Sequence, residues 1–230
     1  MSPRDLSLEA LDADSALTEA ADAVGATTRG QFLRAGGIGG AALAAGLAAP
    51  PAGAEAQQAT NDVDILNYAL ALEYLQAAFY TEAERLGALR GEFADQARVV
   101  GAHERAHVKA LRSALGSAAI RRPRFDFQGV TENQAAFRRT AVAFEDLGTA
   151  AYKDQAPRIS SRAYLAAAIR IHSVEARHAA WIRRLAGVLP APDAFDEPRS
   201  KRSVLRVVTD TGFVTSAPRT SAFGSPRFTG

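Results

Sequence analysis

Six side chains of metal-binding type are spaced so that they could meet at one site. Two E-x-x-H pairs each place a carboxylate and an imidazole one turn apart on the same face of a helix. Two further glutamates stand alone, each ahead of one pair. The candidate ligands are Glu73, Glu104, His107, Glu145, Glu175 and His178.

The second half of this pattern repeats the first. The lone glutamate precedes the glutamate of its E-x-x-H pair by 31 positions in the first half and by 30 in the second. Seven residues after each lone glutamate stands a tyrosine, Tyr80 or Tyr152, which nearly two helical turns bring back to the same face. An internal duplication of a helix pair explains both regularities.

The chemistry of this set is that of a two-metal carboxylate site. Four ionised glutamates balance the charge of two divalent cations, and two neutral imidazoles complete the coordination. Without metal, four carboxylates in an apolar core would each cost several kcal/mol. Oxygen ligands with two imidazoles suit iron first and manganese second, with zinc and copper as competitors on affinity. A lone glutamate on a helix is more often solvated, but six ligands at one level favour a site.

Four helices must position these ligands. Apolar residues at helical spacing surround each ligand, and common start and stop signals bound the helices. Asn61 is expected as the first N-cap, Gly116 as the end of the second helix, and Thr131 with Gln134 as a capping box before the third. The predicted helices span 62–86, 92–115, 132–156 and 161–188.

The connections between these helices predict a topology. Short turns at 87–91 and around Pro157 make each helix pair an antiparallel hairpin. The middle connection, 117–130, has about 14 residues and reaches roughly 46 Å when extended, which is enough to cross the length of the bundle. A slack loop of that length is the alternative to a crossover.

Different contacts are expected from other residues that stand close to the ligands in sequence. Tyr80 and Tyr152 are candidates for hydrogen bonds to a ligand carboxylate, or for a redox role. His172, one turn before the second E-x-x-H pair, is a candidate partner of the ligands or a boundary histidine. His103 points about 100° away from its neighbour Glu104 and is expected at the surface or at the boundary of the core. Trp181 is expected at a helix interface.

Composition narrows the class of protein. The chain has 230 residues and a formal net charge of +2, which gives no reason to expect binding to nucleic acid. It has no cysteine, which excludes disulfides, thiolate metal sites and thiol nucleophiles. Met1 is the sole methionine, which excludes a haem held by an internal methionine.

Residues 1–56 read as an export signal-like leader. A long polar start is followed by Arg29-Gly30-Gln31-Phe32-Leu33, a weakly apolar Ala and Gly run, and an A-x-A site that ends at Ala56. Gly30 stands where a twin-arginine signal has its second arginine. The leader predicts export to the periplasm, the cell surface or the medium, and a disordered leader is the alternative. Its apolar run is too weak for a stable membrane span.

The rest of the chain divides into a helical domain, 57–188, and a C-terminal extension, 189–230. The extension is expected to be irregular, with short β-type runs at 204–208 and 212–214 that could pack on the bundle. It contains no motif that carries chemistry.

Residues 61–188 resemble the ferritin-like superfamily, because the two lone glutamates and the two E-x-x-H pairs match its ligand pattern at all six positions. With the leader and the stretch Asn67-Tyr68-Ala69-Leu70-x-Leu72-Glu73, the chain looks like the exported bacterial ferritin-like domain group, related to plant desiccation-associated proteins. The resemblance implies an all-α, ferritin-like four-helix bundle of two hairpins with a long crossover. It also implies that Glu104 and Glu175 bridge the two metals.

The function expected from this resemblance is redox chemistry with Fe(II), dioxygen or peroxide at a di-iron or di-manganese centre. A non-catalytic metal-binding or stress-protective protein is the alternative, and a bundle that serves as an interaction scaffold is a third hypothesis. The expected partners are metal ions and dioxygen or peroxide, without nucleic acid. The sequence leaves a homodimer open.

Overall fold

A computed structural model describes residues 52–216, with side chains described for 61–215. The described part is mostly α-helical, with a two-stranded sheet and three short 3-10 turns between the helices. None of its helices is both long enough and apolar enough to cross a membrane. The helices are α4 (Ala52–Leu86), α5 (Glu92–Leu115), α6 (Gln134–Gln155), α7 (Arg162–Leu185) and α8 (Lys201–Asp210).

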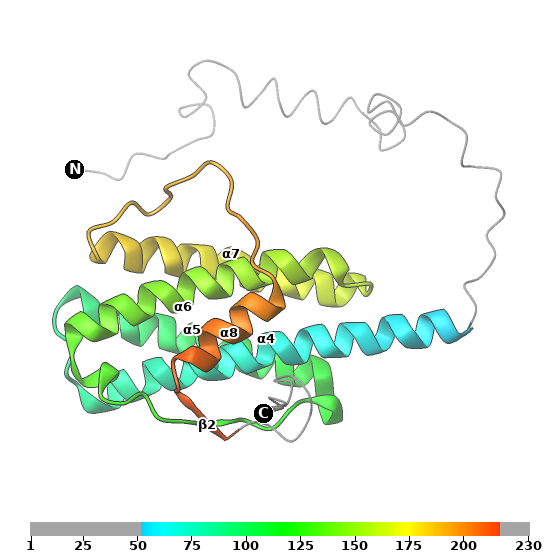
Figure 1. Ribbon diagram of the computed structural model, residues 1–230, viewed down its shortest axis with the longest axis horizontal. Coiled ribbons are helices and arrows are strands. Elements are labelled where there is room, and N and C mark those ends of the chain that lie inside the picture. The colour runs from blue at the N-terminus through cyan, green and yellow to red at the C-terminus, as the bar shows by residue number, and fades with distance from the viewer. Residues whose placement is uncertain (1–51, 217–230) are drawn as a thin grey trace, which may run out of the picture. The chain divides into compact units, whose positions relative to one another are not determined.

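The four long helices form the predicted bundle of two hairpins. Helix α4 packs along α5, and α6 packs along α7 (Figure 1). Contacts between α5 and α7, and between α4 and α6, join the two hairpins. Residues 116–133 connect them and include the turns η1 (Gly116–Ala118) and η2 (Val130–Glu132). The all-α fold and its four-helix bundle are confirmed.

The helix boundaries agree with the sequence signals in some places and differ in others. Helix α5 has the predicted bounds and ends before Gly116, whose φ of 56° suits glycine. Helix α4 begins at Ala52 instead of after Asn61, so the predicted N-cap is wrong. Asn61 instead donates a hydrogen bond from Nδ2 to the carbonyl oxygen of Arg158 at 3.1 Å.

The start of α6 is also two residues later than the predicted capping box. Asn133 is the N-cap, and its Oδ1 accepts hydrogen bonds from the backbone N–H groups of Ala135 and Ala136. The hydroxyl of Thr131 donates instead to Glu82 Oε1 at 2.7 Å, which ties the turn η2 to α4. A tertiary partner thus replaces the local cap that the sequence suggested.

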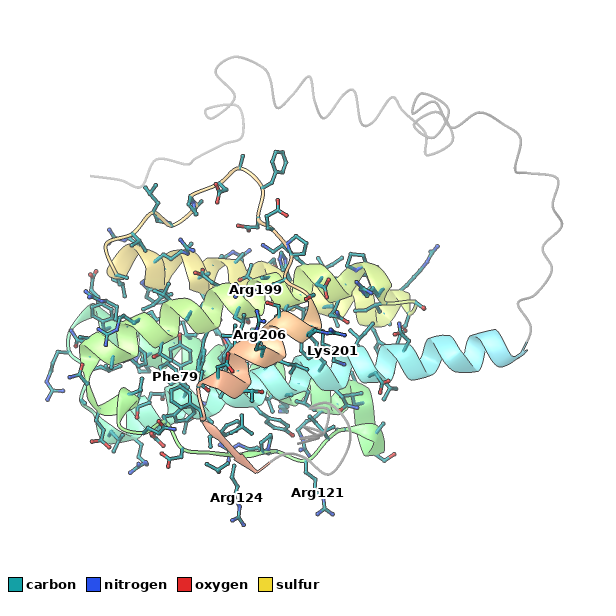
Figure 2. All side chains as sticks on the ribbon, in the orientation of Figure 1. Phe79, Arg121, Arg124, Arg199, Lys201 and Arg206 are labelled. Carbon is teal, nitrogen blue, oxygen red and sulfur yellow. The ribbon has the colours of Figure 1, made fainter. Side chains whose placement is uncertain are left out.

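The C-terminal extension contains a helix where the sequence suggested a β-type run. Val204 and Val208 lie one turn apart on α8 and are almost fully buried against the bundle, with 0% and 1% exposure. After α8, strand β2 (Val214–Ser216) pairs antiparallel with β1 (Arg124–Phe125) of the crossover. Figure 2 shows α8 lying across the bundle, with Arg206 on it and Phe79 in the interior.

Among the residues with described side chains, the apolar core consists of two clusters. One surrounds Phe79, whose ring stacks on Phe137 at 4.9 Å and meets Phe127 and Phe144 edge to face. The other cluster lies further toward the N-terminal end of α4 and includes Leu70. Buried glutamates of all four long helices interrupt this apolar interior.

Candidate metal centre

The structure brings the six predicted ligands together in the interior of the bundle. Each long helix contributes at least one glutamate, so residues up to 105 positions apart meet there. The four glutamates are at most 1% exposed, and His178 is 2% exposed. The His107 side chain is 12% exposed. The cluster consists of Glu73 from α4, Glu104 and His107 from α5, Glu145 from α6, and Glu175 and His178 from α7.

These side chains form two groups that each could hold one ion. Within each group, one ligand atom from every residue lies within 4.8 Å of the others. Glu104 and Glu175 belong to both groups, so their carboxylates lie between the two positions. The first group adds Glu73 and His107, and the second adds Glu145 and His178.

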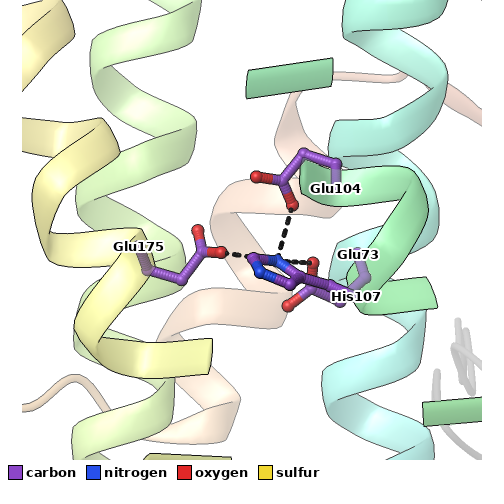
Figure 3. A group of neighbouring side chains, drawn as sticks. All are labelled: Glu73, Glu104, His107 and Glu175. Atoms are coloured by element: carbon purple, nitrogen blue, oxygen red, sulfur yellow. Dashed lines mark ion pairs between the residues drawn. The ribbon is translucent and has the colours of Figure 1, made fainter. Parts of the chain in front are cut away.

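In the first group, His107 lies at the centre of three carboxylates. Its Nδ1 is 3.0 Å from Glu175 Oε1, 3.3 Å from Glu73 Oε2 and 3.5 Å from Glu104 Oε2 (Figure 3). These contacts come from three different helices. The Nδ1 atom of His107 and one oxygen of each of the three carboxylates therefore lie close together.

The second group has the same composition on the other side of the shared carboxylates. His178 Nδ1 is 3.0 Å from Glu104 Oε1, 3.4 Å from Glu145 Oε2 and 3.9 Å from Glu175 Oε1. Both histidines therefore turn Nδ1 toward the glutamates. The equivalence of the two groups follows the repeat seen in the sequence.

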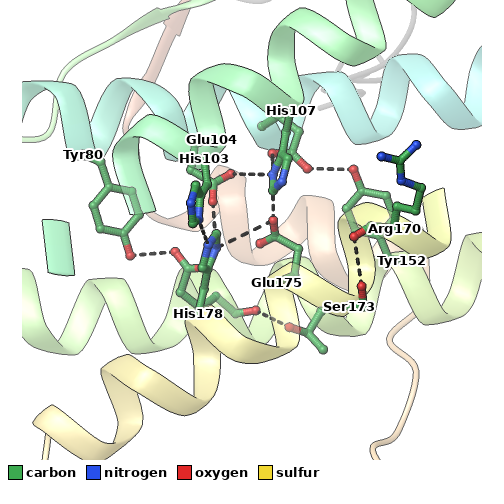
Figure 4. Close-up of polar contacts among 12 residues, drawn as sticks. Tyr80, His103, Glu104, His107, Tyr152, Arg170, Ser173, Glu175 and His178 are labelled. Carbon is green, nitrogen blue, oxygen red and sulfur yellow. Dashed lines mark hydrogen bonds and ion pairs between the residues drawn. The ribbon is translucent and has the colours of Figure 1, made fainter. Parts of the chain in front are cut away.

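Two tyrosines connect the halves of this cluster in a crossed arrangement. The hydroxyl of Tyr80 on α4 donates to Glu145 Oε1 at 2.6 Å, and that of Tyr152 on α6 donates to Glu73 Oε1 at 2.7 Å. Each tyrosine thus reaches the lone glutamate of the other half. Figure 4 shows Tyr80 and Tyr152 on opposite sides of the cluster. Of the two roles predicted for these tyrosines, the hydrogen bonds to glutamates of the cluster are present.

The burial of the tyrosines keeps their hydroxyls protonated. Burial, with the charge of Glu145, raises the pKa of Tyr80 well above its ordinary value. Burial and the charge of Glu73 act in the same way on the pKa of Tyr152. Both groups therefore remain hydrogen-bond donors at neutral pH, and each fixes one oxygen of a glutamate.

The remaining polar atoms of the cluster fit a cation. A buried polar atom without a partner costs roughly 1–3 kcal/mol, so such atoms are rare in folded proteins. Here several share one small region, and all are lone-pair donors of the kind that binds divalent metals. The atoms without a hydrogen bond are Glu73 Oε2, Glu145 Oε2, both carboxylate oxygens of Glu104 and Glu175, and Nδ1 of His107 and His178.

The pKa shifts of the clustered residues also favour neutralisation of the carboxylates by a cation. Burial raises the pKa of Glu104 and of Glu175 well above the ordinary value, and the charges of neighbouring glutamates raise both further. Burial disfavours charge on His107, but its close approach to Glu104, Glu175 and Glu73 raises its pKa to about 12. In the absence of other cations the cluster therefore holds protons. Bound cations would neutralise the same carboxylates in place of those protons.

Two further histidines, His103 and His172, lie close to the clustered residues in sequence but differ in their contacts. His172 is partly exposed, its Nε2 has no hydrogen-bond partner, and it has no hydrogen bond or ion pair with the six ligands in the described part. His103 is exposed, as predicted, yet its Nδ1 lies 2.9 Å from His178 Nε2 (Figure 4). Helical spacing within α5 cannot predict this contact, because His178 is on α7. Trp181 packs against the Phe79 cluster.

Comparison with known proteins agrees with the fold. No curated protein matches the chain. A family model described as a ferritin-like domain matches residues 61–188, which include all four long helices from Asn61 onward and all six clustered residues. Because that match covers more than half of the 230 residues, the chain belongs to the ferritin-like domain family.

Proposed function

We propose that this protein binds two redox-active metal ions, iron or manganese, and reacts with Fe(II), dioxygen or peroxide. The observation that supports this most directly is the pair of ligand groups that share Glu104 and Glu175 in the core. Shared carboxylates would keep two ions close together and would relieve the repulsion between four buried glutamates.

Each ion would have its own histidine and its own lone glutamate in this proposal. Glu73 and His107 would hold one ion, and Glu145 and His178 would hold the other, with Glu104 and Glu175 serving both. When bound, iron or manganese supplies one-electron changes between the +2 and +3 states, which these side chains alone cannot provide.

The side chains around the site have two tasks. Tyr80 and Tyr152 each hold one oxygen of a lone glutamate and leave the second oxygen free for a cation. The apolar clusters around Phe79 and Leu70 limit the access of water, which strengthens electrostatic interactions inside. In the ferroxidase form of the proposal, Fe(II) would be the substrate: oxidation of two Fe(II) to Fe(III) by one dioxygen would consume two protons and release one hydrogen peroxide.

Metal analysis together with turnover assays tests this proposal. Full-length protein purified from its native host should contain iron or manganese. The iron-loaded and manganese-loaded forms should be assayed for oxygen consumption during Fe(II) oxidation and for peroxide decay. The expected result is turnover in at least one form, and its loss in Glu104→Gln and Glu175→Gln.

Glu132→Gln is the matched control, because Glu132 is an exposed glutamate in η2 outside the cluster. It should keep both metal and activity. Metal binding without turnover in either form would contradict the redox function and favour a metal-binding or stress-protective role. Unchanged metal content and stability after substitution of the shared glutamates would instead favour an interaction scaffold.

We also propose that the protein is exported, as the exported ferritin-like group would be. The supporting feature is the leader sequence, most of which lies outside the described residues. Cleavage after Ala56 would shorten α4 by its first residues and keep Asn61 and every ligand. Fractionation of the native host, with sequencing of the mature N-terminus, tests this. Uncleaved protein confined to the cytoplasm would contradict it.

A further inference from the structure

His103 is an exposed residue that contacts His178, the buried histidine of the cluster. It lies on α5 next to Glu104, and its Nδ1 is 2.9 Å from Nε2 of His178 on α7. The two rings are nearly parallel, with an interplanar angle of 15° and centroids 5.2 Å apart. This pair connects α5 to α7 at the cluster (Figure 4).

The contact couples the tautomers of the two histidines, since one ring nitrogen of the pair must donate and the other must accept. A neutral imidazole carries its proton on one nitrogen and a lone pair on the other. His178 Nδ1 lies among the glutamates without a hydrogen bond. If Nε2 carries the proton and donates it to His103 Nδ1, the lone pair of His178 is on Nδ1, where a cation would bind. The remaining N–H of His103 is then on Nε2.

In the other half of the cluster, no histidine stands at the position that corresponds to His103. The two E-x-x-H pairs are offset by 71 positions, so the residue that corresponds to His103 in the second half is Val174. Valine cannot accept a hydrogen bond from an imidazole. Within the described residues, Nε2 of His107 has no hydrogen bond to another protein group. The repeat therefore preserves the ligands but not the residue that orients the histidine.

We infer that His103 is a positioning residue that makes the two metal positions unequal. It holds His178 in the orientation and tautomer that a metal requires, while His107 lacks an equivalent partner. The position formed with Glu145 and His178 therefore binds metal more tightly than the position formed with Glu73 and His107. This inference rests on the proposed metal binding.

Titration of metal-free, full-length protein with Co(II) tests the inference by calorimetry and by the absorption of bound cobalt. Wild-type protein should bind two Co(II) ions in two resolved steps. His103→Val copies the residue of the other half and should weaken the tighter step roughly ten- to a hundred-fold, the usual effect of losing such a partner. The weaker step should stay the same.

His103→Asn separates positioning from a general effect on folding. The amide oxygen of asparagine can take the place of Nδ1 as acceptor, so this variant should restore most of the lost affinity. Ser113→Val is the matched control, since it places valine at another exposed position of α5. When metal-free, His103→Asn and Ser113→Val should melt like wild type, whereas His103→Val should melt slightly lower because buried His178 loses its hydrogen-bond partner.

The outcomes distinguish this inference from the function on which it rests. Two equal binding steps in wild type, or an unchanged tighter step in His103→Val, would overturn the inference and leave metal binding in place. Equal losses in His103→Asn and His103→Val would also overturn it. No Co(II) binding by wild type would overturn the proposed function together with the inference.

Discussion

At the scale of single residues, the crossed tyrosines show how the cluster is held in place. Each tyrosine hydroxyl is buried and donates to a glutamate from the other half of the repeat. Tyr80 and Tyr152 therefore couple the two hairpins through polar bonds in an apolar interior. Substitution of either tyrosine should therefore remove a hydrogen bond from a glutamate of the opposite hairpin.

Removing one of these hydroxyls should reduce stability. We expect Tyr152→Phe to lower the free energy of unfolding of the metal-free protein by about 1.5–3 kcal/mol, because Glu73 loses a charge-assisted hydrogen bond. Urea unfolding followed by circular dichroism measures it. Tyr68→Phe is the control, since the Tyr68 hydroxyl is buried without a hydrogen-bond partner and its removal should cost almost nothing. Equal effects of the two substitutions would contradict this account.

The site residues show which contacts a sequence can and cannot predict. Both E-x-x-H pairs are local, so helical spacing alone placed Glu104 with His107 and Glu175 with His178. The contact between His103 and His178 depends on the relative position of α5 and α7, and helical spacing within α5 cannot predict it. The crossing of the tyrosines depends on helix packing in the same way.

At the scale of elements, tertiary contacts replace several local signals. Asp62 lies inside α4, yet its carboxylate accepts hydrogen bonds from the backbone N–H groups of Ser160 and Ser161, both at 2.8 Å. Ser161 is the N-cap of α7. A residue of the first hairpin thus satisfies backbone donors at the start of the last bundle helix, which local sequence signals do not predict.

Loss of this carboxylate should destabilise the bundle. We expect Asp62→Ala to cost about 2 kcal/mol, since two backbone donors at the start of α7 lose their acceptor. Asp64→Ala, at an exposed position two residues later on α4, should change stability by less than about 0.5 kcal/mol. Denaturant unfolding of both variants provides the comparison. A loss with Asp64→Ala as large as that with Asp62→Ala would argue against the interaction.

The boundaries of the elements likewise depend on local signals in some places and on tertiary contacts in others. The end of α5 was predictable because Gly116 provides a strong local stop signal. The β-type run predicted at 204–208 is wrong, because a short apolar run fits a strand or a helix equally well. Helix α8 forms there because helical spacing brings Val204 and Val208 onto one face, where the bundle buries both.

At the scale of the whole molecule, the polar cluster lies within an otherwise apolar interior. Helix α4 contributes to both apolar clusters, with Phe79 in one and Leu70 in the other, and Glu73 lies between them in sequence. Charge in this region must be neutralised for the whole bundle to remain packed. Metal binding and global stability should therefore be linked.

This linkage predicts a melting temperature that depends on metal. A ligand that binds only the folded state at one site, at 100 times its dissociation constant, stabilises by about 2.7 kcal/mol. For a domain of this size that corresponds to a rise of about 5–11 °C, and two sites would add to it. Calorimetric scans of full-length protein with a chelator, and with saturating Mn(II), measure the difference. The double variant Glu104→Gln with Glu175→Gln should show no rise. A rise of the same size in that variant would place the bound metal outside the cluster, and no rise in wild type would contradict the linkage itself.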